Sequence, residues 1–213
     1  MGDRTLFFYG TLMSPPILHR VIHGPSNPTF PTPSSSYVRT CPAILHSHRR
    51  HRVRGADYPA IVPESASDAS VRGTFATGLT DADVRRLDIF EGDEYERRNV
   101  RVRRLVDSGT GKGEGEEVER EMHEVEEEVR AETYIWIAGK QRLEDEEWDF
   151  ETFKRDKMRF WIGSDGEEGS TGKEEFGAVD QVDGTGGRNP NGHIWKQVEE
   201  QHGDAGGVIR GAV

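Results

Sequence analysis

The spacing of apolar residues near the start of the chain predicts a strand that turns directly into a helix. The run "TLFFY", residues 5–9, is apolar and aromatic and stops at Gly10, which is typical of a buried strand. Ser14 suits the N-cap of a following helix, and Pro15 suits its first position, where a missing N–H removes no hydrogen bond. Apolar residues then recur at helical spacing, at Ile17, Leu18, Val21 and Ile22. The segment "YGTLM" is therefore predicted to carry the chain from a strand into a helix that Gly24 ends.

Further along, alternating and aromatic runs predict more strands and one more helix. "YVRTCPAILHSHRRHRV" (37–53) and "VRGTFATGL" (71–79) are typical of strands. "RNVRVRRLV" (98–106) and "AETYIWIAG" (131–139) predict two strands that pair as a hairpin. A helix is expected in "EEWDFETFKRDKMRFWI" (146–162). Its packing residues are Phe150, Phe153 and Trp161.

Between these strands, a further helix has clear signals at both of its ends. Thr80 is followed three residues later by Asp83, which is the pattern of a capping box. Asp81 and Asp83 also favour the positive end of a helix dipole. Gly92 offers the left-handed backbone that closes a helix, so the sequence predicts a helix over residues 81–91.

The apolar face of this helix contains a carboxylate. Val84 and Leu87 are three residues apart, and the next position on the same stripe is Glu91. An acid there meets the negative end of the dipole and loses contact with water, and both effects are expected to raise its pKa. A raised pKa suits a general acid and base near neutral pH, so the pattern nominates Glu91 as a catalytic residue.

A second orientation of this helix stays open on the pattern alone. A helix of about three turns could rotate so that Ile89 and Phe90 face inward and Glu91 faces water. Arg97 and Arg98 would also be free to form surface ion pairs, each worth under about 1 kcal/mol. The acids within their reach in the sequence are Asp93, Glu94 and Glu91.

The turn after the first strand could supply a second half of a site. Backbone N–H groups of residues 10–13, next to a helix start, form a cradle for a carboxylate or a developing oxyanion. Gly10 allows close approach of the backbone. Junctions of this kind also occur in proteins that bind nothing there, so the signal gains meaning only together with Glu91.

Length and composition indicate one compact domain with polar additions. The chain has 213 residues, of which 33% are apolar, and its net charge is -11. Residues 107–132 hold eleven acids against three bases, a net charge of -8, which is typical of a solvated loop. We expect inserts at 24–36, which holds four prolines and four serines, and at 107–128. The glycine-rich and charged segment 164–213 is expected to be a largely disordered tail, which leaves one domain within residues 1–163.

Cysteine usage and hydropathy indicate a cytoplasmic protein. The single cysteine, Cys41, excludes an intramolecular disulfide framework and suits a reducing compartment. The apolar stretch near the N-terminus is too short for a secretory signal, and no run of 18 apolar residues predicts a membrane helix. We therefore expect no association with a membrane.

The segment "HSHRRHRVR", residues 46–54, raises rival hypotheses. It has three histidines and four arginines, yet no paired acid or cysteine completes a set of metal ligands. Its positive charge lies within an acidic chain and lacks interleaved aromatic residues, which argues against nucleic acid as a partner. A solvated strand or hairpin without metal is the expectation. Cys41 has no placed histidine or acid to activate it and is expected to pack.

Three motifs taken together resemble one known family. These are "FFYGTLM" at the N-terminus, "YPAIVP" at 58–63 and "VRGTFATGLTDADVRRLDIFEGDEYERRNVRV" at 71–102. In this order and spacing they resemble the γ-glutamylcyclotransferase-like family. The most similar branches are the plant avirulence-induced-protein-like proteins and the γ-glutamylamine cyclotransferases, and the helix "EEWDFETFKRDKMRFW" adds to the likeness with the plant branch. The resemblance covers about residues 4–163 apart from the inserts.

The resemblance implies a fold and a set of site residues. The fold class would be α+β, a small mixed β-barrel with flanking helices and a pocket at one end. The family acid, in the pattern Leu-Asp-x-Phe-Glu, falls on Glu91. The family's substrate loop falls on Tyr9, Gly10, Thr11 and Leu12. The motif Tyr-x-Arg after the acid falls on Tyr95 and Arg97, and Tyr95 is expected to bind substrate.

The implied reaction needs neither a cofactor nor a metal. The α-amine of a γ-glutamyl amine or peptide would attack its own γ-carbonyl, close 5-oxoproline and release an amine or amino acid. The partner would then be a small-molecule γ-glutamyl substrate. The alternative is a catalytically silent protein of the same fold that acts in stress response through protein interaction. The leaving group and the oligomeric state stay open.

Overall fold

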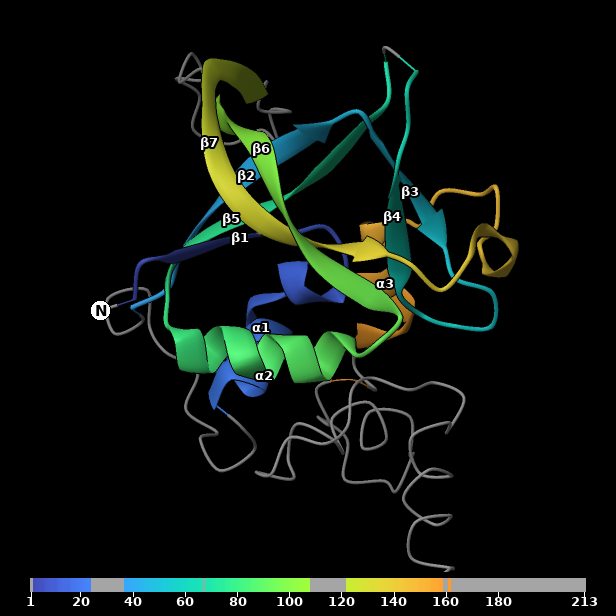
Figure 1. The fold of residues 1–213 in the computed structure, drawn as a ribbon, viewed down its shortest axis with the longest axis horizontal. Helices are drawn as coiled ribbons and strands as arrows, with labels where there is room; N and C mark the ends of the chain where they lie inside the picture. Colours follow the sequence, from blue (N-terminus) through green and yellow to red (C-terminus); the bar gives the residue numbers. More distant parts are fainter. Residues whose placement is uncertain (1, 24–36, 67, 108–121, 159–160, 162–213) are drawn as a thin grey trace, which may run out of the picture.

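Five strands form a closed barrel at the centre of the molecule (Figure 1). The structure is a computed structural model, and it describes residues 2–23, 37–66, 68–107, 122–158 and 161. The barrel strands follow the order β1-β5-β2-β6-β7. Their bounds are Arg4–Phe8 for β1, Arg39–His46 for β2, Ser70–Leu79 for β5, Tyr95–Asp107 for β6 and Met122–Trp136 for β7. Neighbouring strands are antiparallel except where β1 meets β7 in parallel, with Leu6 opposite Glu132, so the mixed barrel that was predicted is confirmed.

In the described part of the chain, a small second sheet and three helices lie beside this barrel (Figure 1). Strands β3 (His48–Arg52) and β4 (Pro59–Pro63) pair antiparallel beside it. The helices are α1 (Pro15–His23), α2 (Asp81–Glu91) and α3 (Phe150–Asp156), and 3-10 turns span Thr11–Met13 and Lys140–Arg142. In Figure 1 α1 and α2 lie together below the barrel. No helix in the described part of the chain has the length and hydrophobicity that crossing a bilayer requires.

The core has two parts because side chains alternate along each strand. One cluster receives residues from all five barrel strands and fills the barrel interior. Its members include Phe7, Ala43, Val71, Val102 and Ala131. The other cluster lies between the outer face of the barrel and the helices, and its members include Leu6, Phe8, Ile17, Leu87 and Phe153. Strand β1 therefore serves both clusters, which makes its end a fixed point for the turn that follows.

The predicted helices near residues 15–23 and 81–91 are confirmed, whereas the last helix begins later than predicted. Instead of beginning at Glu146, α3 begins at Phe150 and spans Phe150–Asp156. Met158 and Trp161 are helical as well, while residues 159, 160 and 162 lie outside the described residues. The preceding residues are hydrogen-bonded to β3: the N–H of Arg52 donates to the carbonyl of Glu146, and the carbonyl of Arg52 accepts from the N–H of Glu144. Helix formation can therefore begin only after this pairing ends.

Strand β4 and part of the acidic segment are findings that the sequence patterns did not predict. The "YPAIVP" segment forms β4 because both of its prolines lie at the ends of the strand, where a missing N–H is tolerated. The insert was expected at 107–128, but its last residues belong to a strand, because β7 already begins at Met122. Its carboxylates are paired across the hairpin, with Arg103 bound to Glu124 at 3.1 Å and to Glu128 at 3.4 Å. The expected loop at 24–36, residues 108–121 and the expected tail at 164–213 lie outside the described residues.

Candidate active site

The chain leaves the barrel after β1 through a tight turn at residues 10–13. Gly10 packs against β4 so closely that a Cβ atom there would lie 2.8 Å from Pro59 Cγ. Met13 N–H donates to the carbonyl of Gly10 at 2.9 Å, and Ser14 N–H donates to that of Thr11 at 3.1 Å. The first amides of a helical turn have no acceptor within it, so the N–H groups of Thr11 and Leu12 are left over in this turn. The predicted cradle of amides at 10–13 thus narrows to residues 10–12.

The acid of the site comes from the last turn of α2. This helix begins with the predicted capping box, in which the Thr80 hydroxyl accepts from Asp83 N–H and Asp83 accepts from Thr80 N–H. The helix presents Val84, Leu87 and Glu91 on its buried face, and Glu91 has an exposed fraction of 8%. Phe90 is buried as well, yet Glu91 does not turn to water. Of the two orientations that the sequence left open, the structure therefore adopts the one with Glu91 on the buried face.

Gly92 ends α2 in a way that differs in detail from the prediction. Its φ of 74° is positive, as expected, but its ψ of -169° lies outside the left-handed helical region. Its N–H donates to the carbonyl of Asp88 at 3.0 Å. This conformation is open almost only to glycine, so the residue after Glu91 is fixed by backbone geometry.

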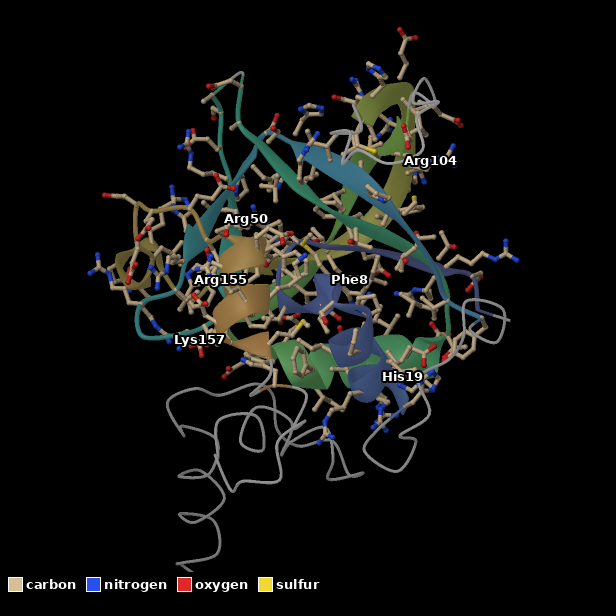
Figure 2. All side chains as sticks on the ribbon, turned by 180° about the vertical axis from the view of Figure 1, so that it is seen from behind. Phe8, His19, Arg50, Arg104, Arg155 and Lys157 are labelled. Carbon is tan, nitrogen blue, oxygen red and sulfur yellow. The ribbon has the colours of Figure 1, made fainter. Side chains whose placement is uncertain are left out.

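One pocket brings Glu91 and the turn together. Its cavity volume is about 20 Å³, and it opens to solvent. Its lining residues are Phe7, Phe8, Tyr9, Gly10, Thr11, Leu12, Pro59, Glu91 and Tyr134. Phe8, labelled in Figure 2, belongs to the cluster that packs against the helices and so forms an apolar wall. A buried carboxylate thus shares a small pocket with a turn whose first amides are not used within it.

Thr11 contributes a hydroxyl to this pocket. The residue is 1% exposed, and its Oγ1 has no hydrogen-bond partner among the described residues. Burying a hydroxyl without a partner costs free energy, typically about 1–3 kcal/mol in proteins. A ligand in the pocket would supply that partner, which agrees with the predicted role of Thr11 in binding.

Tyr9 is one of the residues that line the pocket. Its ring belongs to the cluster inside the barrel, and its hydroxyl donates to the carbonyl of Tyr134 at 2.6 Å. Tyr95, in contrast, is not among the residues that line the pocket. Its hydroxyl donates to the carbonyl of Pro59 at 2.9 Å and its ring packs edge-on against Trp136, so direct binding of substrate by Tyr95 is not supported. It supports the pocket wall that Pro59 forms.

Tyr134 is a pocket residue that sequence reasoning missed. It is 4% exposed, and its hydroxyl donates to Asp88 Oδ1 at 2.9 Å. Burial raises the pKa of Tyr134 well above its ordinary value, and the negative charges of Asp88 and Glu91 raise it further. Arg97 opposes this shift only weakly, so Tyr134 is a neutral donor at physiological pH. No signal within "AETYIWIAG" separates this tyrosine from a packing residue, because its partner lies on a distant helix.

Arg97 has different partners from those that its sequence neighbours suggested. Its Nε donates to Asp88 Oδ1 at 2.8 Å, and its Nη1 forms an ion pair with Glu132. Arg98 pairs with Glu96. The hairpin places Arg97 opposite Tyr134, and α2 brings Asp88 to both. Arg97 therefore holds Asp88 in place, and Asp88 accepts the hydrogen bond from Tyr134. Asp88 lies about one helical turn before Glu91.

The other candidate groups play no part in this pocket. In the described residues, His, Cys, Asp and Glu side chains do not gather into a group of three or more that could hold a metal ion. Cys41 is half-buried beside the cluster inside the barrel, and burial raises the pKa of its thiol, so the prediction that it packs is confirmed. Residues 46–52 form the end of β2 and strand β3, as the prediction of a strand or hairpin required.

Comparison of the sequence with known proteins points to one family. Residues 6–150 match the family model described as "Gamma-glutamyl cyclotransferase, AIG2-like". AIG2-like protein B of Arabidopsis thaliana is 31% identical over 157 residues, which cover 74% of this chain and 73% of that protein. Protein AIG2 C of the same plant is 29% identical over 152 residues, which cover 71% and 73%. The solution structure of an Arabidopsis thaliana protein is 27% identical with a TM-score of 0.47, and the match covers 76% of this chain and 88% of that one.

Proposed function

This chain belongs to the AIG2-like γ-glutamyl cyclotransferase family, and from that premise and its pocket we propose that it cyclises a γ-glutamyl amine or peptide to 5-oxoproline. The observation that carries the proposal is the joint presence of buried Glu91 and residues 9–12 in one small pocket. A pocket with one inward acid and several donors suits an intramolecular reaction, in which the substrate supplies both reacting groups.

The chemistry can be written without a covalent enzyme intermediate. The α-nitrogen of the substrate attacks the γ-carbonyl carbon, and a new C–N bond closes the five-membered ring. The bond from that carbon to the leaving nitrogen then breaks, and the oxyanion returns to a carbonyl. One proton moves from the attacking nitrogen to the leaving nitrogen, so the products are 5-oxoproline and a free amine or amino acid. No water enters the balance.

Each part of the pocket has a role in this scheme. Glu91 takes the proton from the attacking nitrogen and delivers it to the leaving nitrogen, as a general base and then a general acid. The N–H groups of residues 10–12 and the Thr11 hydroxyl bind the α-carboxylate and the developing oxyanion. Phe7 and Phe8 keep the site dry, which strengthens these interactions. Tyr134, held by Asp88, remains protonated beside Glu91.

The raised pKa of Glu91 stays a prediction. The side chain is 8% exposed and lies in the last turn of its helix, and both conditions disfavour the charged form. It would appear as the acid limb of a pH profile of kcat, displaced upward from the value near 4.3 that an ordinary glutamate shows.

Glu91→Gln tests the proposal, because it removes proton transfer and nearly preserves shape. The assay offers a panel of γ-glutamyl peptides and γ-glutamylamines and measures 5-oxoproline. We expect Glu91→Gln to lower kcat by about 10²- to 10⁴-fold, the usual contribution of general acid–base catalysis. Glu94→Gln is a matched control, because the side chain of Glu94 is also largely buried, with an exposed fraction of 17%. Glu94 pairs with Arg142 and does not line the pocket.

The outcomes separate the hypotheses. Wild-type kcat in folded Glu91→Gln would refute the role of Glu91, and an equal loss in Glu94→Gln would attribute the effect to stability. A wild-type protein that forms no 5-oxoproline from any member of the panel would favour the alternative, a non-catalytic protein that acts through interaction.

A further inference from the structure

Arg50 stands apart from the other arginines of the basic segment on β3. Its side chain is only 11% exposed, whereas those of Arg49 and Arg52 are 52% and 46% exposed. The segment was expected to be a solvated strand, and for Arg49 and Arg52 this is the case. Burying a guanidinium requires partners for its donors, so the position of Arg50 needs a separate explanation.

The guanidinium of Arg50 reaches the turn of the pocket. Its Nη1 donates to the carbonyl of Tyr9 at 3.1 Å and lies 3.5 Å from the carbonyl of Arg72. Its Nη2 donates to Glu147 at 2.9 Å, and its Cζ lies 5.7 Å from the centre of the Trp148 ring. Figure 2 labels Arg50 on the side where the two-stranded sheet adjoins the barrel. A permanently charged group is thereby fixed against the backbone of the first residue of the "YGTL" turn.

The carbonyl that Arg50 holds belongs to the same peptide group as the N–H of Gly10. A peptide group is planar, and the described residues contain no cis bond, so its C=O and N–H point in opposite directions. When Arg50 fixes the direction of the Tyr9 carbonyl, it also fixes the N–H of Gly10, on the side away from Arg50. Gly10 lines the pocket with Glu91.

A charged donor on a carbonyl also changes the N–H of the same peptide group. Hydrogen bonds to an ionised group are stronger than neutral ones, and linked hydrogen bonds polarise each other. Withdrawal of electron density through the Tyr9 carbonyl makes the N–H of Gly10 a stronger donor. Such a donor suits an oxygen that becomes negative during a reaction.

We propose that Arg50 is a positioning residue that aims and strengthens the N–H of Gly10 as the donor to the oxyanion. The proposal rests on the proposed function for its effect on rate, although the orientation of Gly10 can be measured without any activity. Arg50 acts through the backbone of Tyr9 and does not line the pocket itself.

Arg50→Met tests this inference, because it removes the charged donor and retains an apolar side chain for Trp148. Glu147, its ion-pair partner, is 64% exposed and stays hydrated when the arginine is lost. Arg52→Met is the matched control, since Arg52 lies two residues along the same strand and pairs with Glu146 but has no hydrogen bond to Tyr9. Arg50→Lys keeps the charge without the planar fork and serves for the same measurements if Arg50→Met does not fold.

Two readouts are needed, one chemical and one spectroscopic. We expect Arg50→Met to lower kcat by about 10- to 100-fold, less than the 10²- to 10³-fold typical of a deleted oxyanion donor, because Gly10 is displaced and not removed. KM should change by less than about threefold, since the donor acts chiefly in the transition state. In a ¹H–¹⁵N spectrum of unliganded protein, the Gly10 amide signal should move in Arg50→Met and stay in place in Arg52→Met.

The results decide the proposal separately from the proposed function. A wild-type kcat in folded Arg50→Met overturns it, and so does an equal loss of rate in Arg52→Met. An unmoved Gly10 signal in Arg50→Met also overturns it. If the wild-type protein is inactive on the whole panel, the proposed function fails, and the Gly10 signal alone then shows whether Arg50 orients this amide.

Discussion

The hydrogen bond from Tyr134 to Asp88 can be tested by Tyr134→Phe, which deletes one oxygen and keeps the ring. The phenol is 4% exposed, and it donates to a carboxylate at 2.9 Å. A hydrogen bond to a charged group contributes about 1.5–3 kcal/mol. Asp88 recovers part of this, because 41% of its side chain is exposed and Arg97 still binds it. We therefore expect Tyr134→Phe to lower the free energy of unfolding by about 1–2 kcal/mol at pH 7.

The difference in free energy of unfolding between wild type and Tyr134→Phe should depend on pH, and this dependence is a sharper test than the size of the difference. Burial and the charges of Asp88 and Glu91 raise the pKa of Tyr134 in the folded protein, while in the unfolded chain it titrates near 10. Below pH 10 both states keep the proton, so the stabilising contribution is fully present. Above pH 10 the unfolded state loses its proton first, and the contribution falls by about 1.4 kcal/mol per pH unit. Wild-type protein should thus lose its advantage over Tyr134→Phe within one to two units above about pH 10.

Urea denaturation of both proteins between pH 7 and 11 measures this difference. Subtracting the two free energies of unfolding cancels the titration of all other groups that behave alike in both. Tyr37→Phe is a second test of the same reasoning, because burial and the hydrogen bond from Tyr37 to Asp83, at 2.9 Å, raise the pKa of Tyr37 to about 12. The difference between wild type and Tyr37→Phe should therefore also fall above about pH 10. A difference between wild type and Tyr134→Phe that stays constant or grows from pH 9 to 11 would refute the reasoning.

Two further substitutions test the parts that place the pocket. Thr80→Ala removes the hydroxyl of the capping box and should lower the free energy of unfolding, measured by urea denaturation, by about 1–2 kcal/mol. The folded variant should keep the wild-type kcat, because Thr80 and Glu91 lie at opposite ends of α2. A loss below about 0.3 kcal/mol would contradict the role of this cap. Gly10→Ala would place a Cβ 2.8 Å from Pro59 Cγ, so the turn must shift, and we expect kcat/KM for 5-oxoproline formation to fall at least about tenfold. Wild-type kcat/KM in this variant would show that the close approach of Gly10 to Pro59 does not shape the site.

Local signals in the sequence were sufficient for the helices that carry the site. The start of α2 depends on Thr80 and Asp83, three residues apart, and its end on Gly92, which directly follows Glu91. Interactions over such short separations are set by helix geometry itself, so they can be predicted without knowing the rest of the chain. The same holds for α1, where Pro15 opens the helix as predicted.

Predictions failed where distant segments compete for the same residues. A helix was predicted from Glu146 onward, but the carbonyl of Glu146 accepts a hydrogen bond from Arg52 of β3, some 90 positions earlier in the chain, and the helix begins only at Phe150. The acids of the expected insert became part of β7 because arginines of β6 lie opposite them. In both cases the pairing partner, and not the local pattern, decided the conformation.

The sequence by itself determined which helix bears the acid and which residues form the turn after β1, because these depend on neighbours within four residues. It left two orientations of that helix open, and packing decided that Glu91 lies on the buried face. Only the tertiary structure decided what meets at the pocket. Closure of the barrel by β1 and β7 brings Tyr134 beside the end of β1, α2 adds Asp88 and Glu91, and β3 adds Arg50. These contacts join residues that are 41 to 125 positions apart in the chain. They leave no periodic pattern in a single sequence, because an apolar strand face can pack against many different apolar partners of suitable size.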